Sequence, residues 1–155
     1  NYCHGRNKNS VGKSMTQTKY PFVSPGWIEM ATAVLQKLIG QHGEEGVRYS
    51  VCEAFVDAPP EFADSEGLAA WHFFVDGKDV RVSSGKVDDA DVYIQATWET
   101  SLPSARLVYT PELIAERTKN PPKAPDDPNQ MVRGDISILP SYLGELHNVM
   151  AVATQ

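Results

Sequence analysis

Residues 71–99 read WHFFVDGKDVRVSSGKVDDADVYIQATWE, and apolar and polar side chains alternate along them in three short runs. The apolar members are Trp71, Phe73 and Val75, then Val80 and Val82, then Val92, Ile94, Ala96 and Trp98. Alternation with a period of two, bounded by turn residues such as Asp76-Gly77, is typical of β-hairpins. The pattern predicts three antiparallel strands, with a second tight turn at Gly85 to Asp89. All three place their apolar residues on one face, which needs a cover.

A helix is predicted before these strands. Ser24 is a suitable N-cap and Pro25 suits the first turn. The apolar residues that follow recur at i, i+3, i+4, i+7, i+8 and i+11, and they are Trp27, Met30, Ala31, Val34, Leu35 and Leu38. Such a stripe is typical of an amphipathic helix that packs on a core. Gly40 and Gly43 are expected to end it.

The remaining segments predict one strand before the three strands, one strand after them, and two further helical regions. Alternation at residues 47–55 predicts a strand, residues 101–116 predict short helices with a new start at Thr110-Pro111, and residues 120–128 are a proline-rich loop. Val132, Ile136 and Ile138 are expected in a last strand, and Pro140 begins a last helix. This order predicts an α+β fold whose helices lie on one face of the sheet.

The same motifs, in this order, resemble the sterol carrier protein type-2 family of lipid-binding domains. The resemblance rests on Trp71, Asp76-Gly77, Gly85, the DADVYI segment at 89–94 and the MVRGDI segment at 131–136 before the last apolar stretch. It covers roughly residues 27–152 and suggests a divergent, bacterial-type member. It implies a single domain over residues 15–155, with a five-stranded, mostly antiparallel sheet covered on one face by helices and an apolar tunnel between the layers.

The resemblance also implies a function, namely the non-covalent binding or transfer of a fatty acyl chain, an acyl-CoA or a sterol-like molecule. Arg106, Arg117 and Lys119 are the basic candidates for a headgroup contact at the tunnel mouth. The residues expected to line the tunnel are Met30, Val34, Leu38, Phe73, Ile94, Trp98, Leu102, Leu107, Leu113, Ile138, Leu143 and Leu146.

Two other hypotheses remain open. A small cavity enzyme, such as a hydratase, isomerase or cyclase, would use His72 as a base, oriented by Tyr93 or Asp91, with Arg106 as a further polar group. The competing interpretation of His72 is an outward-facing side chain, because it alternates with Trp71 and Phe73. The third hypothesis is an accessory subunit that docks its open sheet face on a larger lipid- or steroid-metabolising enzyme, or on a second copy of the chain.

No cofactor or metal site is expected. Residues 10–14, SVGKS, resemble the end of a phosphate loop, but Asn7 stands where that loop requires its first glycine. The cysteines and histidines show no zinc spacing, and Cys52 lies in a strand pattern that favours a buried, reduced thiol.

The charge and composition argue against several kinds of partner. The chain has 155 residues, 41% of them hydrophobic, and a net charge of −6, which argues against nucleic acid and anionic membrane surfaces as main partners. No apolar run approaches the length of a membrane span, and no signal peptide is visible, so a cytoplasmic location is expected.

The first fourteen residues are polar and basic and lack apolar periodicity, so we expect a flexible extension that contributes little to folding. Deleting them is expected to leave the melting temperature within a few degrees in a calorimetric scan. A fall of order 10 °C, equivalent to more than about 1–2 kcal/mol, would instead show that they pack on the domain.

Overall fold

The computed structural model describes residues 18–155, so the predicted extension at residues 1–14 lies outside the described residues. The elements are α2 (Pro25–His42), β1 (Arg48–Val56), β2 (Ala69–Asp76), β3 (Asp79–Ser84), β4 (Val92–Thr97), α3 (Trp98–Ala105), α4 (Pro111–Lys119), β5 (Met131–Arg133), the 3-10 turn η1 (Ile136–Ile138) and α5 (Leu143–Ala153). Among these, no helix is both long and apolar enough to cross a bilayer.

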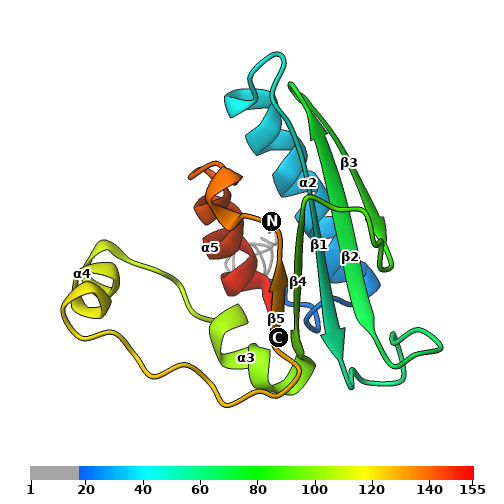
Figure 1. Cartoon of the computed structure of the whole chain (residues 1–155), viewed down its shortest axis with the longest axis vertical. Coiled ribbons are helices and arrows are strands. Elements are labelled where there is room, and N and C mark those ends of the chain that lie inside the picture. The colour runs from blue at the N-terminus through cyan, green and yellow to red at the C-terminus, as the bar shows by residue number, and fades with distance from the viewer. Residues whose placement is uncertain (1–17) are drawn as a thin grey trace, which may run out of the picture.

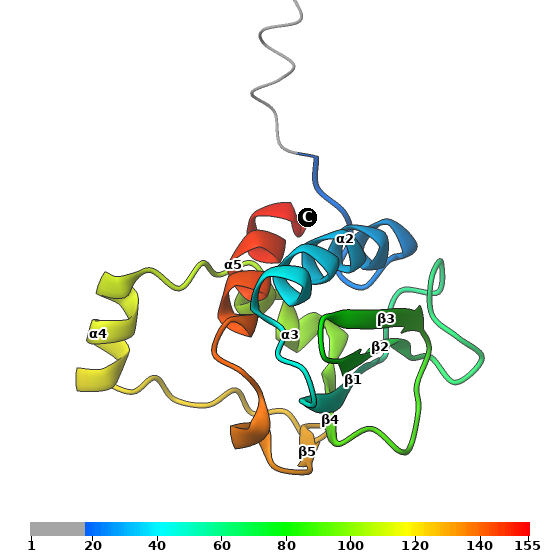
Figure 2. The ribbon, with the colours of Figure 1, turned by 90° about the horizontal axis from the view of Figure 1, so that it is seen from above.

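The five strands form one sheet in the order β3-β2-β1-β4-β5. Neighbouring strands are antiparallel except for β1 and β4, which run parallel. Helices α2, α3 and α5 lie on one face of this sheet (Figures 1 and 2). The predicted fold class is confirmed, because this is an α+β fold with a mostly antiparallel, five-stranded sheet covered on one side.

The prediction of a second tight turn at Gly85 to Asp89 was wrong. β2 and β3 do form a hairpin at Asp76-Gly77, but β3 is an edge strand and β4 pairs with β1 instead. The connection from β3 to β4 crosses the open face of the sheet, where Val87 and Ala90 pack against buried residues of β1, β2 and β4. Alternation predicts which face of the sheet a side chain occupies. It does not predict which strands lie side by side, and the polar segment between β3 and β4 carries no signal that β4 pairs with β1.

The last strand is shorter than the sequence predicts. β5 ends at Arg133, and Gly134 follows with φ +92°, a left-handed conformation that breaks the ladder. Ile136 and Ile138, predicted in the strand, lie instead in the turn η1, where the Asp135 carboxylate accepts a hydrogen bond from the Ser137 backbone N–H. Helix α5 begins at Leu143 rather than at Pro140.

Helix α2 confirms the predicted stripe and closes one half of the sheet. The Ser24 hydroxyl caps it by accepting from the Trp27 backbone N–H at 3.3 Å, and Gly43 is its C-cap. Ala31, Leu35 and Ile39 are completely buried beneath it. These side chains belong to the buried hydrophobic core of the domain.

The other half of the sheet has a thinner cover. Helix α3 has only eight residues, contains Pro103 and buries none of its side chains. Helix α5 buries only Met150, Ala151 and Ala153, all near its C-terminal end. Every residue of β5 is exposed. Space is therefore left between the sheet and its helices on this side.

The segment between α3 and β5 leaves the body and returns to it, and α4 lies away from the sheet (Figures 1 and 2). Its first end is tied down by the Tyr109 backbone N–H, which donates to Asn148 Oδ1 at 2.8 Å. Its second end is tied down by Asp127, which accepts from the Thr97 backbone N–H at 2.7 Å. The return loop is thereby held against the thinly covered half.

Candidate functional site

A cavity of about 430 Å³ lies between the helix-facing side of the sheet and the helices α3 and α5. Its apolar wall consists of Phe22, Trp27, Val51, Phe55, Trp71, Phe73, Ile94, Ala96, Ala105, Pro125, Leu139, Leu143, Leu146 and Met150. Its polar members are Glu53, Thr100, Ser101, Ser104, Asp127, Gln130 and His147. A concave apolar site with a few convergent polar groups is typical of small-molecule binding.

One end of the cavity is a rigid aromatic corner. The rings of Trp27 and Trp71 meet edge to face with their centroids 5.3 Å apart. Phe22 contacts Trp27 in the same manner at 5.4 Å, and Phe73 contacts Trp71 at 5.3 Å. The Trp27 indole N–H donates to Thr154 Oγ1 at 3.0 Å, which fixes the ring. Aromatic pairs with these geometries hold their shape without a ligand.

Glu53 places a carboxyl group on the sheet wall of the cavity. Strand alternation puts it on the same face as Val51 and Phe55, because side chains two apart share a face. Its Oε1 accepts from the Trp71 indole N–H at 2.8 Å. Burial raises the pKa of this carboxyl, and the hydrogen bond from Trp71 offsets only part of the rise.

A second acid, Asp127, lies where the return loop meets the cavity. Its carboxylate accepts three hydrogen bonds, from the backbone N–H and hydroxyl of Thr97, both at 2.7 Å, and from the backbone N–H of Asn129 at 3.0 Å. These bonds hold the pKa of Asp127 below its usual range. The group is therefore a fixed negative charge at the rim.

His147 completes the ionisable groups of the cavity. Its Nε2 lies 2.8 Å from the carbonyl oxygen of Leu107, and since a carbonyl only accepts, Nε2 carries the proton. The Tyr109 ring packs on the imidazole with a centroid distance of 4.9 Å. The other nitrogen, Nδ1, is then an acceptor in the neutral ring.

Four of the twelve residues predicted to line the tunnel line this cavity, and they are Phe73, Ile94, Leu143 and Leu146. The other eight lie elsewhere. Leu38 is buried, Met30, Val34, Trp98 and Leu102 pack against the core, Leu107 and Leu113 are half-buried, and Ile138 is 48% exposed. Helix α2 thus contributes Trp27 to the cavity but none of the three stripe residues predicted for it.

None of the residues predicted for the enzyme hypothesis lines the cavity. His72 lies on the open face, with Nδ1 2.8 Å from the Gly85 carbonyl oxygen. Asp91 braces the crossover by accepting from the Ser50 backbone N–H at 2.9 Å. Arg106 donates to the backbone oxygen of Gln155 at 2.7 and 2.9 Å.

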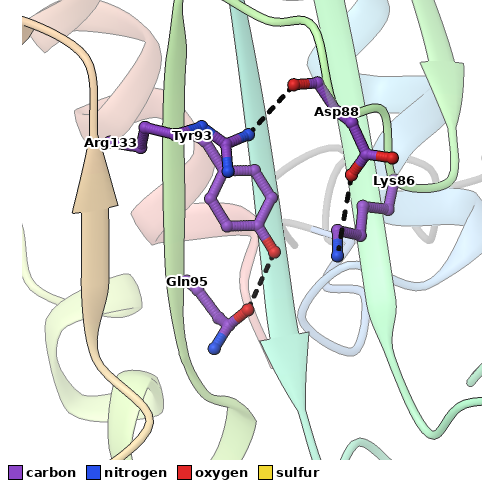
Figure 3. Close-up of polar contacts among 5 residues, drawn as sticks. All are labelled: Lys86, Asp88, Tyr93, Gln95 and Arg133. Atoms are coloured by element: carbon purple, nitrogen blue, oxygen red, sulfur yellow. Dashed lines mark hydrogen bonds and ion pairs between the residues drawn. The ribbon is translucent and has the colours of Figure 1, made fainter.

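Tyr93 also belongs to the open face, in the cluster drawn in Figure 3. The guanidinium of Arg133 lies 4.6 Å from its ring centroid and the ammonium of Lys86 lies 5.5 Å from it. Its hydroxyl donates to Gln95 Oε1 at 2.8 Å. Two cations therefore lie against this ring, as expected for cation–π packing, and the Gln95 amide pairs with its hydroxyl.

The basic residues predicted at the tunnel mouth do not line the cavity either. Arg117 lies on α4, with its guanidinium 5.7 Å from the Tyr109 ring centroid, and Lys119 is exposed on the same helix. Within residues 18–155, no group of three or more His, Cys, Asp or Glu side chains is arranged to hold a metal ion. Cys52 is free and buried, as predicted.

Glu53 escaped prediction from sequence, although a signal was present. Residues 49, 51, 53 and 55 share one face of the predicted strand, so a carboxylate at position 53 interrupts an otherwise buried apolar row. An ionisable group on a buried face, with its pKa raised by burial, is a common mark of a functional site.

Glu53→Gln is expected to raise the melting temperature near pH 7 by a few degrees. The folded-state pKa of Glu53 lies above the ordinary value of 4.5, so folding favours the protonated form. Stability is then lost as the pH rises from that ordinary value through the raised one. Glutamine keeps the oxygen that accepts from Trp71 and removes the cost of burying an ionised carboxylate. A gain of about 1 kcal/mol raises the melting temperature by roughly 2–4 °C in a domain of this size.

The gain should shrink as the pH falls below the ordinary pKa, because the carboxyl is then protonated in both the folded and the unfolded chain. Glu145→Gln, which removes an exposed carboxylate of α5, is the matched control and should show no such pH dependence. Equal melting temperatures for Glu53→Gln and the parent near pH 7 would show that Glu53 is not perturbed by burial.

Comparison with known proteins finds likeness in structure only. No protein-family model matches the chain, and no curated protein is significantly similar to it. The chain is similar to a solution structure from Thermus thermophilus, a conserved hypothetical protein described as possibly a sterol carrier protein, with 14% identity and a TM-score of 0.42 over 90% of this chain and 97% of that chain.

A second similar structure is the UbiJ-SCP2 ubiquinone synthesis protein, with 13% identity and a TM-score of 0.30 over 76% of this chain and 75% of that chain. The first description reads possibly sterol carrier protein, and the second carries the label SCP2. At TM-scores below 0.5 these likenesses carry no argument about the ligand, which has to be inferred from the chain's own residues.

Proposed function

We propose that this chain binds an apolar small molecule non-covalently in the cavity between the sheet and helices α3 and α5. The observation that carries the proposal is the cavity itself, with a volume of about 430 Å³ and a wall built largely from tryptophan, phenylalanine and aliphatic side chains. Ligand pockets in proteins span roughly 300–1,000 Å³ and have this composition. The resemblance to a lipid-binding family adds the ligand class, an acyl chain or a sterol-like molecule, and a role in its transfer.

The energetics favour modest, reversible binding. Burial of an aliphatic chain gains about 0.8 kcal/mol for each methylene. A twelve-carbon chain therefore gains roughly 9–10 kcal/mol, of which association takes at least about 4. The remainder, at most about 5–6 kcal/mol, corresponds to a dissociation constant of roughly 50–200 μM or weaker.

Saturable binding of a fluorescent acyl chain to the purified protein tests the proposal. We expect one-to-one stoichiometry, and native mass spectrometry should show the same complex. Phe73 and Phe74 are neighbours on opposite faces of β2, and only Phe73 lines the cavity. Phe73→Ala should change the affinity, whereas Phe74→Ala, at a side chain 40% exposed on the open face, should not. Absence of saturable binding would contradict the proposal.

One observation favours a cavity enzyme as the second candidate. Glu53, with its raised pKa, is suited to give a proton, and Nδ1 of His147 is suited to take one in the same cavity. Such a pair would support proton transfer within a hydrophobic ketone. Incubation of 2-dodecanone in D₂O should then exchange hydrogens beside the carbonyl faster with the parent than with Glu53→Gln. Equal exchange in both would remove this candidate.

A further inference from the structure

Only one of the two carboxyl oxygens of Glu53 accepts a hydrogen bond from the described residues. Oε1 accepts from the Trp71 indole N–H, while Oε2 makes no hydrogen bond with any residue that the structure describes. Within residues 18–155, every side-chain nitrogen or oxygen that is fully buried has a hydrogen-bond partner. An oxygen without a partner, such as Oε2, is therefore not fully buried. Since Glu53 lines the cavity, Oε2 is therefore reachable from the cavity space.

Among the described residues, no positive side chain is available to this oxygen. The ion pairs within residues 18–155 are Arg48–Asp76 and Lys86–Asp88, and neither involves a cavity residue. The described lining contains no lysine or arginine, and His147, the remaining basic group there, forms no ion pair with Glu53. Thr100, Ser101, Ser104 and Gln130 are neutral.

The charge that is present is negative. Asp127 is held as a carboxylate by Thr97 and Asn129 at the side of the return loop, and Glu53 adds a second acid on the sheet wall. An anionic headgroup entering this site would meet two acids and no fixed cation from the described residues. A fatty acid or a phosphate-bearing thioester is therefore disfavoured, and a cation is favoured.

We propose that the cavity selects an apolar amine, whose ammonium group donates a hydrogen bond to Oε2 of Glu53 while its hydrocarbon part contacts the aromatic corner. This inference rests on the proposed function, from which it keeps the apolar cavity, and it replaces the acyl or sterol-like ligand with an amine. A buried carboxylate without a partner is destabilising, and an ammonium supplied by the ligand completes the pair. The Trp71 indole holds the carboxylate in place, so the ion pair has one fixed member before the ligand arrives.

Three probes with the same twelve-carbon chain separate the headgroup from the tail. Dodecylamine, dodecanol and dodecanoate compete with a bound fluorescent acyl probe on the full chain near pH 7, and each is kept below the concentration at which it forms micelles or separates from solution. We expect dodecylamine to bind one-to-one and at least about tenfold more tightly than dodecanol, with dodecanoate weakest; tenfold corresponds to about 1.4 kcal/mol.

Glu53→Gln should lower the affinity for dodecylamine at least tenfold and leave that for dodecanol within about threefold. Glu145→Gln is the matched control, because it removes the same charge from the exposed side of α5 and should leave all three affinities unchanged. This control also separates cavity binding from attraction of amines to the acidic surface of the whole protein, which carries a net charge of −6.

The outcomes distinguish this inference from the proposed function. Dodecanoate binding as tightly as dodecylamine to the parent would overturn the inference whether or not the variant folds, and so would an undiminished preference for amine in Glu53→Gln. Either result would leave apolar binding in place. Failure of all three probes to bind would overturn the proposed function itself.

Discussion

Ala105→Trp is expected to abolish saturable binding of an acyl probe while leaving the domain folded. Ala105 is the last residue of α3 and lines the cavity, and α3 buries no side chain of its own. An indole at this position projects into unoccupied space and removes the volume that the ligand requires. We expect the affinity to fall more than tenfold, measured by fluorescence titration, with the melting temperature within a few degrees of the parent. Leu143→Trp, from α5, should act in the same way.

The matched control is Ala115→Trp, which makes the same substitution on α4, away from the cavity and at an exposed position. It should bind the probe as the parent does. If the space were a filled core, tryptophan at position 105 or 143 would overpack it and cost about 1–3 kcal/mol. A destabilised Ala105→Trp, together with a parent that does not bind, would contradict the cavity account.

Gly134→Val is expected to destabilise the protein by about 2–5 kcal/mol. Gly134 has φ +92°, a conformation that costs a residue with a side chain roughly 1–2 kcal/mol. An added Cβ would also collide with the backbone carbonyl of Asp91, adding an overpacking cost of about 1–3 kcal/mol. The midpoint of urea unfolding should fall accordingly, with little change in the slope of the transition.

Gly144→Val provides the comparison, because a Cβ at that position meets no atom within 4 Å and the backbone has no left-handed strain. It should shift the midpoint much less. The structure gives Gly134 a structural role for two reasons, its left-handed backbone and the close approach of the Asp91 carbonyl. An unchanged midpoint for Gly134→Val would mean that the contact with Asp91 is not maintained in solution.

Local patterns were sufficient for most elements of the fold. The stripe of α2, its Ser24 cap and the Thr110 cap of α4 are all where the sequence places them, because each depends on residues within one helical turn. Strand pairing was harder to predict. β3 and β4 look like consecutive members of a meander, yet β1 lies beside β4, and this pairing depends on contacts far apart in the chain.

The site was predictable only in part for a related reason. Periodicity assigned Phe73 and Ile94 to the covered face, but it gave no information on how closely a helix approaches that face. The stripe of α2 therefore entered a filled core at Met30, Val34 and Leu38, while the cavity formed under the short helices. The position of Glu53 in the strand, two residues from Val51 and from Phe55, already indicates that its side chain faces inward.

Photoaffinity labelling reports where an apolar ligand lies on the protein. A dodecyl chain with a terminal diazirine is bound to the full chain, irradiated, and its attachment sites are mapped by peptide mass spectrometry. Binding in the cavity predicts labels on residues of β1, β2 and α5 that line it, such as Val51, Phe73 and Leu146, and the loss of these labels in Ala105→Trp. Labels confined to the open face around Phe74 or to α4, unaffected by Ala105→Trp, would contradict it.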